Sequence, residues 1–307
     1  MHARNVLARI QQIIVLTLFG GAVAAFIVGA QWGHAWTGPG FVVLVVTGYV
    51  GVLGIEFWLL SRSYARDDAE RPRIGQLLRA WAIEMLVAPR AFLWQQPFRS
   101  ASEPDHLPVD ARGKVGVVLV HGFFCNRGLW NPWLRRLRAA GVPFVAVSLE
   151  PVFGSIDDYG ASVAAAAAAV EHATGRPPLV VAHSMGGLAT RAWLRRDAGA
   201  RLHGLVTIAT PHAGTRLAGH GRGRNVEQMR QGSAWLADLQ GPDATTTRTN
   251  VVCFWSDCDN IVFPTRSATL PGADNRHLPA TPHVAMVFHP AVIGEVLRAT
   301  AAAGTAR

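Results

Sequence analysis

The sequence contains little that could build a disulfide framework or a metal site. Its three cysteines, Cys125, Cys253 and Cys258, form an odd and sparse set without the spacing of metal ligands. They fit free thiols in a reducing compartment, although Cys253 and Cys258 are near enough along the chain to pair. No calcium or other metal and no other cofactor is indicated, and the sequence has no internal repeat.

Acidic residues are fewer than basic ones, 20 against 29, so the chain carries a formal charge of +9. The arginines are scattered and no nucleic-acid recognition motif accompanies them, which disfavours nucleic acid as a partner. Positive charge also suits a protein that lies against an anionic lipid surface, where each basic group adds roughly 1 kcal/mol of attraction. We therefore expect a membrane as the partner. The sequence does not indicate an oligomeric state.

Charge is nearly absent from two stretches near the N-terminus. Residues 13–30 contain no charged side chain, and residues 41–60 contain only Glu56. About 20 apolar residues span the ~30 Å hydrocarbon core as a helix. A secretory signal peptide or two buried core helices are alternatives, but the two stretches follow each other closely and neither has a polar stripe. We predict a transmembrane helical hairpin over residues 1–61.

Basic residues flank only one side of this hairpin. Arginines precede the first stretch and follow the second, whereas the loop at residues 31–40, QWGHAWTGPG, has no Lys or Arg. By the positive-inside rule both ends face the cytoplasm. We predict a two-pass protein of the inner (cytoplasmic) membrane with everything after residue 61 in the cytoplasm. The flanking arginines are Arg4, Arg9, Arg62, Arg66, Arg71 and Arg73.

Residues 62–113 are predicted to be a charged linker that contains one amphipathic helix. Over residues 75–98, apolar side chains that include tryptophans recur at helical spacing, with arginines alongside. Such a face can lie in the membrane interface. It can equally cover the core of the next domain, and the sequence does not choose between the two. Residues 99–113 are proline-containing and aperiodic, so they continue the linker.

Strand and helix patterns alternate from residue 114 to the end. Apolar strands that alternate with helices indicate a mainly parallel sheet covered on both faces. We therefore predict an α/β domain over residues 114–307. The expected strands are 115–120, 144–149, 179–182, 205–209 and 251–255, and the expected helices are 129–140, 159–172, one that ends at Arg195, and 290–302.

The third expected strand runs directly into a serine. In LVVAHSMGG, residues 179–187, small residues stand two positions before and after Ser184, namely Ala182 and Gly186. A nucleophilic serine on the sharp turn between a strand and a helix needs small residues there, usually as G-x-S-x-G. Alanine replaces the first glycine here and is small enough to fit. The pattern and its placement together indicate that Ser184 is a nucleophile.

A serine nucleophile needs a histidine base and an acid that orients this base, in the chain order Ser, acid, His. The stretch SDCDNIVFP, just beyond the last expected strand, offers two acids. We prefer Asp259, because the following Ile-Val-Phe-Pro can hold its loop, and keep Asp257 in reserve. His283, in the loop before the final helix, is the preferred base. His277 and His289 are the alternatives.

The tetrahedral intermediate also needs backbone N–H donors. We expect one from Met185, which follows the nucleophile, and one from Phe123, where Gly122 lets the loop after the first strand turn inward. Losing one such donor costs about 10²- to 10³-fold in rate. His121 and His183 flank these positions and are expected to be structural.

From about Lys114 onward the chain resembles the α/β-hydrolase superfamily, in particular bacterial lipases and esterases with an AHSMGG turn. VLVHGF resembles their oxyanion loop, TIATPHAGT their TPHxGT segment, and SDCDNIVFP their acid loop. The resemblance implies an α/β-hydrolase fold and hydrolysis of hydrophobic acyl esters or lipids, as by a triacylglycerol lipase, through an acyl-enzyme on Ser184. An acyltransferase or thioesterase on the same residues, or a non-catalytic membrane scaffold or transporter partner, is the alternative.

Residues 214–247 form a long insertion between two expected strands. Part of this insertion, MRQGSAWLADL, has an apolar helical face. We expect a lid over an acyl pocket, with an ordinary surface helix as the alternative.

Overall fold

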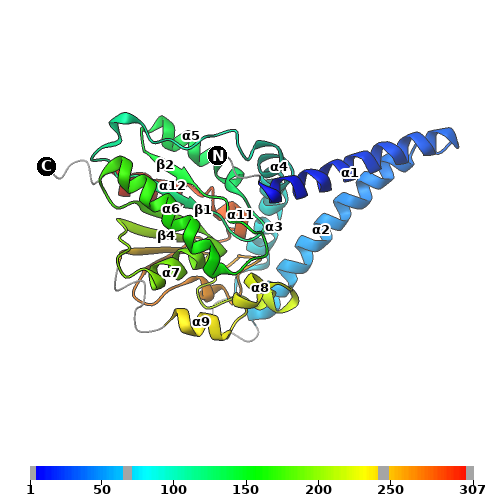
Figure 1. Cartoon of the computed structure of the whole chain (residues 1–307). Coiled ribbons are helices and arrows are strands. Elements are labelled where there is room, and N and C mark those ends of the chain that lie inside the picture. Colours follow the sequence, from blue (N-terminus) through cyan, green and yellow to red (C-terminus); the bar gives the residue numbers. More distant parts are fainter. Residues whose placement is uncertain (1–4, 65–70, 241–248, 302–307) are drawn as a thin grey trace.

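A long helical hairpin projects from an α/β body in the computed structural model (Figure 1). The structure describes residues 5–64, 71–240 and 249–301. The hairpin consists of α1 (Val6–Gln31) and α2 (Thr37–Ser63). Between the hairpin and the body lie α3 (Ile74–Pro89), a π-helical turn η2 (Arg90–Gln95) and α4 (Gln96–Arg99).

The body contains a sheet of six strands in the order β2-β1-β3-β4-β5-β6, and all neighbouring strands are parallel. In the register of its centre, Val118 lies opposite Val180, which lies opposite Leu205. The strands are β1 (Val117–Val120), β2 (Phe144–Ala146), β3 (Leu179–His183), β4 (Gly204–Ile208), β5 (Val251–Trp255) and β6 (Asp274–His277).

Helices cover both faces of this sheet, because strands that are apolar on both sides must be buried on both sides. One core packs α6 and α7 against the sheet, with Tyr159 and Leu188 near its centre. The other packs α5 and α12, with Trp133 and Val296. The helices of the body are α5 (Asn131–Ala139), α6 (Ile156–Thr174), α7 (Met185–Arg196), α8 (Arg224–Gln228), α9 (Ala234–Leu239), α11 (His283–Met286) and α12 (Pro290–Ala301). Short 3₁₀ turns are η3 (Val109–Ala111), η4 (Arg127–Trp130), η5 (Arg216–His220) and η6 (Thr265–Ala268).

The α/β fold predicted from the alternating pattern is confirmed, with two differences at the sheet edges. The second strand ends at Ala146 rather than at residue 149. The chain turns away there, and the Leu149 N–H donates to Nε2 of His121 instead of to a strand. The last strand, β6, was not predicted, because its residues are polar and mostly exposed and so lack an apolar run.

Within the residues that the structure describes, three helical segments are long and apolar enough to cross a membrane: Val6–Gln31, Thr37–Ser63 and His283–Ala301. The third contains α11 and α12 and packs on the sheet through Val292 and Val296. The first two are exposed along most of their length. They include the predicted spans 13–30 and 41–60 but extend beyond both.

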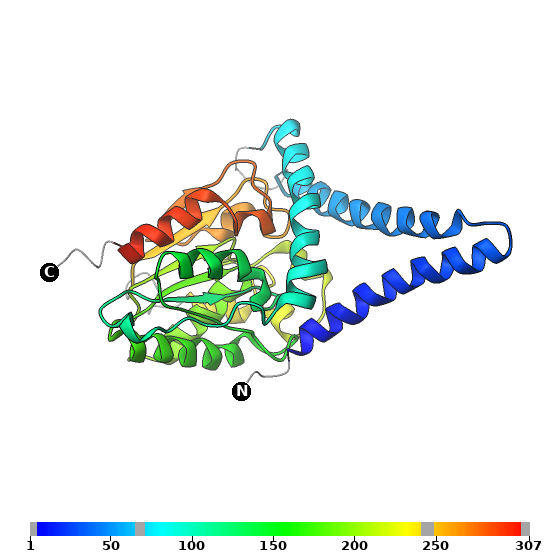
Figure 2. The same cartoon turned by 90° about the horizontal axis from the view of Figure 1, so that it is seen from above.

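The hairpin helices are longer than the predicted spans because their ends dock on the body. Leu7 and Gln11 of α1 are buried, and Gln11 donates to the Phe124 carbonyl. At the other end, Phe57 and Leu60 of α2 join a cluster with Phe263 from the body. Figure 2 shows α1 and α2 diverging from the tip of the hairpin toward these two docking points, with α3 crossing between them.

The predicted amphipathic helix is α3, which the sequence placed either in the membrane interface or on the core of the next domain. This helix has a buried and an exposed face. Ala80, Glu84 and Ala88 are buried. Ile74 and Leu86 are at least three-quarters exposed. The helix α3 therefore covers the body with its buried face. Its opposite face carries exposed apolar side chains.

Close packing behind Ser184 leads to a first prediction. A Cβ added to Gly186 would lie 2.6 Å from the carbonyl oxygens of Val120 and His121, whereas a Cβ on Gly294 in α12 would meet nothing within 4 Å. We expect Gly186→Ala to lower the free energy of unfolding by about 1–3 kcal/mol. Gly294→Ala should raise it by roughly 0.5–1 kcal/mol, because alanine is the better helix former. Thermal unfolding of the detergent-solubilised chain measures both. Equal midpoints for the two variants would contradict the prediction.

Candidate active site

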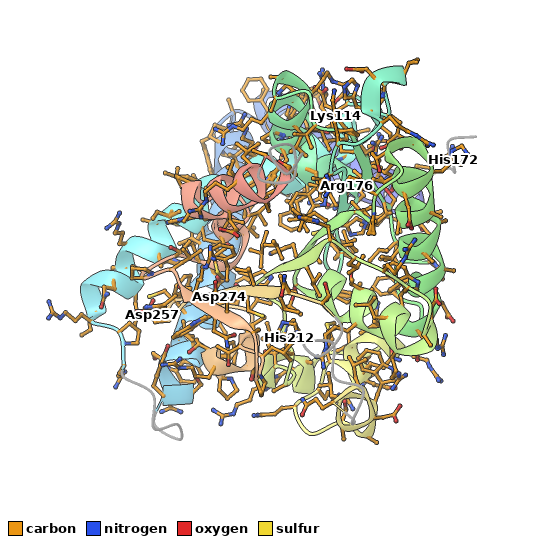
Figure 3. The ribbon with its side chains drawn as sticks, turned by 90° about the vertical axis from the view of Figure 1, so that its left-hand side faces the viewer. Lys114, His172, Arg176, His212, Asp257 and Asp274 are labelled. Atoms are coloured by element: carbon orange, nitrogen blue, oxygen red, sulfur yellow. The ribbon has the colours of Figure 1, made fainter. Side chains whose placement is uncertain are left out.

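Ser184 occupies a strained turn between β3 and α7. Its φ of 53° and ψ of −128° are unusual for a residue with a side chain, and its N–H donates to the Ile208 carbonyl over 2.8 Å. The chain packs so closely that a Cβ on Gly122 would lie 2.8 Å from the Ser184 Cβ. The turn therefore presents the serine hydroxyl at the carboxyl end of the sheet, where α/β proteins build their sites. Figure 3 shows the body from the opposite side, with Lys114, Arg176 and Asp274 at the amino ends of β1, β3 and β6.

His283 and Asp259 form a buried pair. Nδ1 of His283 lies 2.9 Å from Oδ1 and 3.1 Å from Oδ2 of Asp259. Oδ1 of Asp259 also accepts the N–H groups of Ile261 and Val262, each over 2.9 Å. These bonds hold the carboxylate in place. The loop residues expected to hold Asp259 thus do so through their backbone.

The environment of His283 favours its charged form. Burial acts to lower the pKa of this imidazole, but the nearby charge and hydrogen bond of Asp259, together with Glu84 and Glu56, outweigh burial and raise it. A base with a raised pKa accepts a proton readily, provided that the pH keeps it neutral at the start.

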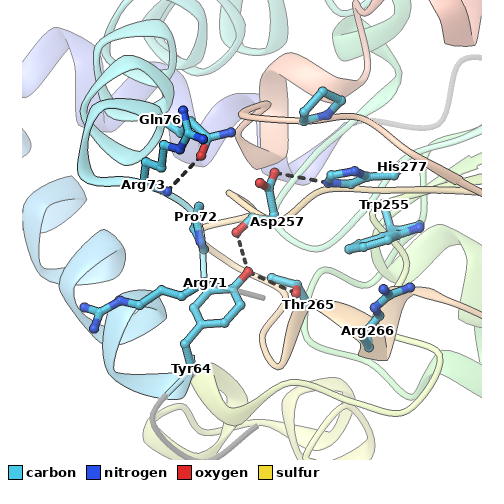
Figure 4. A pocket seen from close by; sticks show the side chains of 11 residues that line it. Tyr64, Arg71, Pro72, Arg73, Gln76, Trp255, Asp257, Thr265, Arg266 and His277 are labelled. Carbon is cyan, nitrogen blue, oxygen red and sulfur yellow. Dashed lines mark hydrogen bonds and ion pairs between the residues drawn. The ribbon is translucent and has the colours of Figure 1, made fainter. Parts of the chain in front are cut away.

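The reserve candidates form a separate pair. Nε2 of His277 lies 3.2 Å from Oδ1 of Asp257, which also accepts the Ala280 N–H. Both residues line a cavity of about 600 Å³ between α3 and β5, shown in Figure 4. Ser184 lines a different cavity. His289 caps the last helix, since its Nδ1 accepts the Ala291 N–H.

A cavity of about 280 Å³ joins Ser184 and His283. Most of its lining side chains are apolar, and the lining comes from α2, α3, η2 and α11, the end of β3 with the turn after it, and the loops after β1 and β5. The lining residues outside the triad candidates are Tyr49, Val52, Leu53, Glu56, Glu84, Ala88, Phe92, Gly122, Phe123, Cys125, His183, Asn260, Ile261 and Val284.

The residues expected to bind an oxyanion lie around the same serine. Phe123 lines the cavity, and Met185 is the first residue of α7, where backbone N–H groups have no partner within the helix. His121 is buried and its Nε2 accepts the Leu149 N–H, as expected of a structural residue. His183 is buried beside His283, and the two ring centroids are 4.7 Å apart.

Glu84 is a site residue that the sequence did not reveal. It is 1% exposed, and its two oxygens accept the N–H groups of Val284 (2.8 Å) and Ala285 (3.2 Å), directly after His283. Burial raises its pKa to about 7, although the two N–H donors and His283 act in the opposite direction. The carboxylate thus caps α11 and holds the segment that carries the histidine.

Glu56 reaches the same segment from the hairpin. Nδ2 of Asn260 donates to its carboxylate over 2.7 Å, and Oδ1 of Asn260 accepts the N–H of His283 over 3.2 Å. A lone charge in an apolar stretch was the only sequence signal for Glu56. Its partner lies 204 positions away, so its role was not visible in the sequence.

The insertion at residues 214–247 covers the core rather than the cavity in its described part. Met229, Leu236 and Leu239 belong to the core cluster with α6 and α7. None of the described residues of this insertion lines the Ser184 cavity. The apolar face that suggested a lid is therefore already covered, and residues 241–247 lie outside the described part of the chain.

The cysteines and acidic residues form no metal site in the described part of the chain. Cys125, Cys253 and Cys258 are free and buried. Residues 5–64, 71–240 and 249–301 contain no group of three or more His, Cys, Asp or Glu side chains that could hold a metal ion.

The contacts of Glu84 lead to a second prediction. Glu84→Ala leaves two buried N–H groups of α11 without an acceptor, so we expect the free energy of unfolding to fall by about 1–3 kcal/mol. Glu171→Ala is the matched control, because that glutamate is a partly exposed residue paired with Arg201. We expect a change within about 0.5 kcal/mol for the control. A Glu84 variant with the thermal midpoint of the control would show that α11 does not depend on this carboxylate.

Comparisons with known proteins bear on the family and fold of the chain. A family model described as the alpha/beta hydrolase family matches residues 117–297, which is more than half of the chain. Comparison with curated protein sequences gives no match.

Two solved structures resemble the chain in fold. Lipase BlEst2 of Bacillus licheniformis in its mature form is 19% identical, with a TM-score of 0.54 over 62% of this chain and 95% of that one. Lipase B of Aspergillus fumigatus is 20% identical, with a TM-score of 0.56 over 62% of this chain and 53% of that one. The chain thus spans about half the length of the second lipase. The family match, together with the parallel sheet and the strained turn at Ser184, shows that this chain belongs to the α/β hydrolase family.

Proposed function

We propose that the chain is a membrane-anchored serine hydrolase that cleaves carboxylic esters of hydrophobic acyl groups. One observation carries the proposal: the strained Ser184 shares an apolar cavity with His283, which is paired with the buried Asp259. A nucleophile, a base and an orienting acid on three different loops are the parts that acyl transfer needs. The lipases among its structural neighbours support the choice of an ester as substrate.

In the proposed reaction, His283 accepts the hydroxyl proton of Ser184 as Oγ attacks the ester carbonyl carbon. Asp259 holds the imidazole through Nδ1 and stabilises the imidazolium that forms. Backbone N–H groups of Met185 and Phe123 donate to the oxyanion. The intermediate collapses to an acyl-serine, and His283 returns the proton to the leaving alcohol. Water then attacks the acyl-serine by the same sequence of proton transfers and releases the fatty acid.

We test the catalytic assignments with the two histidine–aspartate pairs. Hydrolysis of nitrophenyl esters, from acetate to palmitate, is measured with the detergent-solubilised chain. We expect Ser184→Ala and His283→Ala to abolish turnover, and Asp259→Asn to reduce kcat by about 10³- to 10⁴-fold. Asp257→Asn is the matched control and should retain turnover, because Asp257 pairs with His277 in another cavity.

The pH profile gives a second readout. Activity should rise with pH as His283 loses its proton, with a midpoint above the ordinary value of about 6.5. Asp259 contributes to this raised pKa. In Asp259→Asn the residual activity should therefore still rise with pH, but with a midpoint at a lower pH than in the wild type. If His277→Ala is inactive while His283→Ala is active, the assignment of the base is wrong. A folded wild type that hydrolyses no ester contradicts the proposed hydrolysis and leaves acyl transfer to another acceptor or a non-catalytic role.

We also propose that α1 and α2 span the inner membrane with both chain ends in the cytoplasm. The proposal is supported by the apolar exposed surfaces of these helices and by arginines on their body sides alone. C-terminal fusions to a reporter that is active only in the cytoplasm and to one that is active only outside it test the orientation. We expect signal from the first alone. Signal from the second alone would contradict the orientation.

A further inference from the structure

The transmembrane hairpin forms one wall of the cavity at Ser184. Four residues of α2, Tyr49, Val52, Leu53 and Glu56, line this cavity. Their spacing of three and four positions puts them on one face of the helix. All four lie inside the apolar stretch at residues 41–60. A helix that is apolar enough to cross a membrane is therefore also part of the proposed active site.

Hydrogen bonds from the first and the last of these four residues hold α2 in place beside the cavity. The Tyr49 hydroxyl donates to the Glu84 carbonyl over 3.3 Å, which joins α2 to α3. About two turns further on, Glu56 accepts from Nδ2 of Asn260, and Oδ1 of the same Asn260 accepts the His283 N–H. These contacts place Val52 and Leu53 at a defined position relative to the histidine.

The lining of the cavity reaches the exposed surface of α2 at Val52. Leu53 is 6% exposed, but Val52 is 56% exposed although it lines the same cavity. Ile55, three positions further along α2, is also apolar and exposed, and Val43 and Leu44 are exposed nearer the tip of the hairpin. The apolar lining of the cavity thus includes a residue on the surface that would contact hydrocarbon.

The cavity is lined by both polar and apolar groups. Ser184, His283 and Asn260 lie among its lining residues, together with Glu56 and Glu84, whose carboxylates already accept N–H groups. Val52, Leu53, Phe92 and Phe123 form apolar walls. An ester with a long acyl chain fits this lining, because its carbonyl needs the polar groups and its methylenes avoid water along the apolar walls.

We propose that α2 is the acyl-chain wall of the active site, so that the acyl chain of a bilayer lipid ester reaches Ser184 along α2 without leaving the apolar phase. Val52 and Leu53 are then specificity-determining residues for acyl-chain length. This inference rests on the proposed ester hydrolysis. It assigns to the hairpin a role in substrate selection in addition to anchoring.

The first experiment compares two substitutions on α2 in the full-length chain. Val52→Trp fills the mouth of the cavity, and Ile55→Trp adds the same bulk at a position that is 59% exposed and does not line the cavity. The readout is the ratio of kcat/KM for nitrophenyl palmitate to that for nitrophenyl acetate. We expect Val52→Trp to lower this ratio by about tenfold or more, and Ile55→Trp to leave it at the wild-type value. A ratio unchanged by Val52→Trp, or lowered equally by both, would overturn the inference.

The second experiment does not require turnover. Ser184→Ala protein in proteoliposomes is irradiated with a diacyl phosphatidylglycerol that carries a diazirine near the end of one acyl chain. We expect adducts on Leu53 and on Phe92 or Phe123, which line the cavity, and their loss when Val52→Trp is added. Adducts confined to the outer surface of the hairpin, such as Val43 and Leu44, would overturn the inference.

The two experiments separate this inference from the proposed function. Ser184-dependent hydrolysis with an unchanged chain-length ratio and no adducts in the cavity rejects the acyl-chain wall alone. Adducts in the cavity without hydrolysis of any ester reject the hydrolytic function but retain an acyl-binding cavity bounded by α2.

Discussion

The position of the His283 segment depends on two buried carboxylates, those of Asp259 and Glu84. Asp259 bonds to the imidazole, and Glu84 bonds to the two backbone N–H groups that follow it. A buried carboxylate without partners is strongly unfavourable, so each must sit where donors are available. Both acids find their donors here because α3 lies against α11 and the loop after β5 carries Asp259 to the histidine. The hairpin adds a third carboxylate, Glu56, through Asn260.

These hydrogen bonds connect α2 and α3 to the candidate site, whose cavity the same two helices also line. Glu84 acts on α11 from α3, and Glu56 acts on Asn260 from α2. The helix α3, which follows the hairpin, and α2 of the hairpin itself thus both hold the segment of the proposed base, and α2 also supplies a wall of its cavity. In this arrangement the hairpin and α3 provide the apolar cover that we had expected from the insertion at residues 214–247. That insertion instead buries its apolar residues in the main core.

Steric constraint at the turn complements this electrostatic constraint. Ser184 has a φ of 53°, and Gly122 and Gly186 leave no room for a Cβ beside it. The chain can hold such a strained residue because β3 and α7 are buried over almost their whole length. The strained turn and the close packing around it fix the position of Ser184, which lines the cavity.

The sequence by itself determined the α/β domain, the positions of its main strands along the chain, the two apolar helices and the pattern of small residues around Ser184. These follow from local patterns: runs of apolar residues, their period, and small residues around one serine. It also narrowed the proposed acid and base to a few residues, Asp259 or Asp257 and His283, His277 or His289. Only the tertiary structure paired Asp259 with His283 in the cavity of Ser184 and Asp257 with His277 elsewhere. Only the tertiary structure brought Glu56 and Glu84 to residues about 200 positions away. Such pairs depend on how helices pack against loops that are distant in the chain, and no local pattern in the sequence encodes that packing.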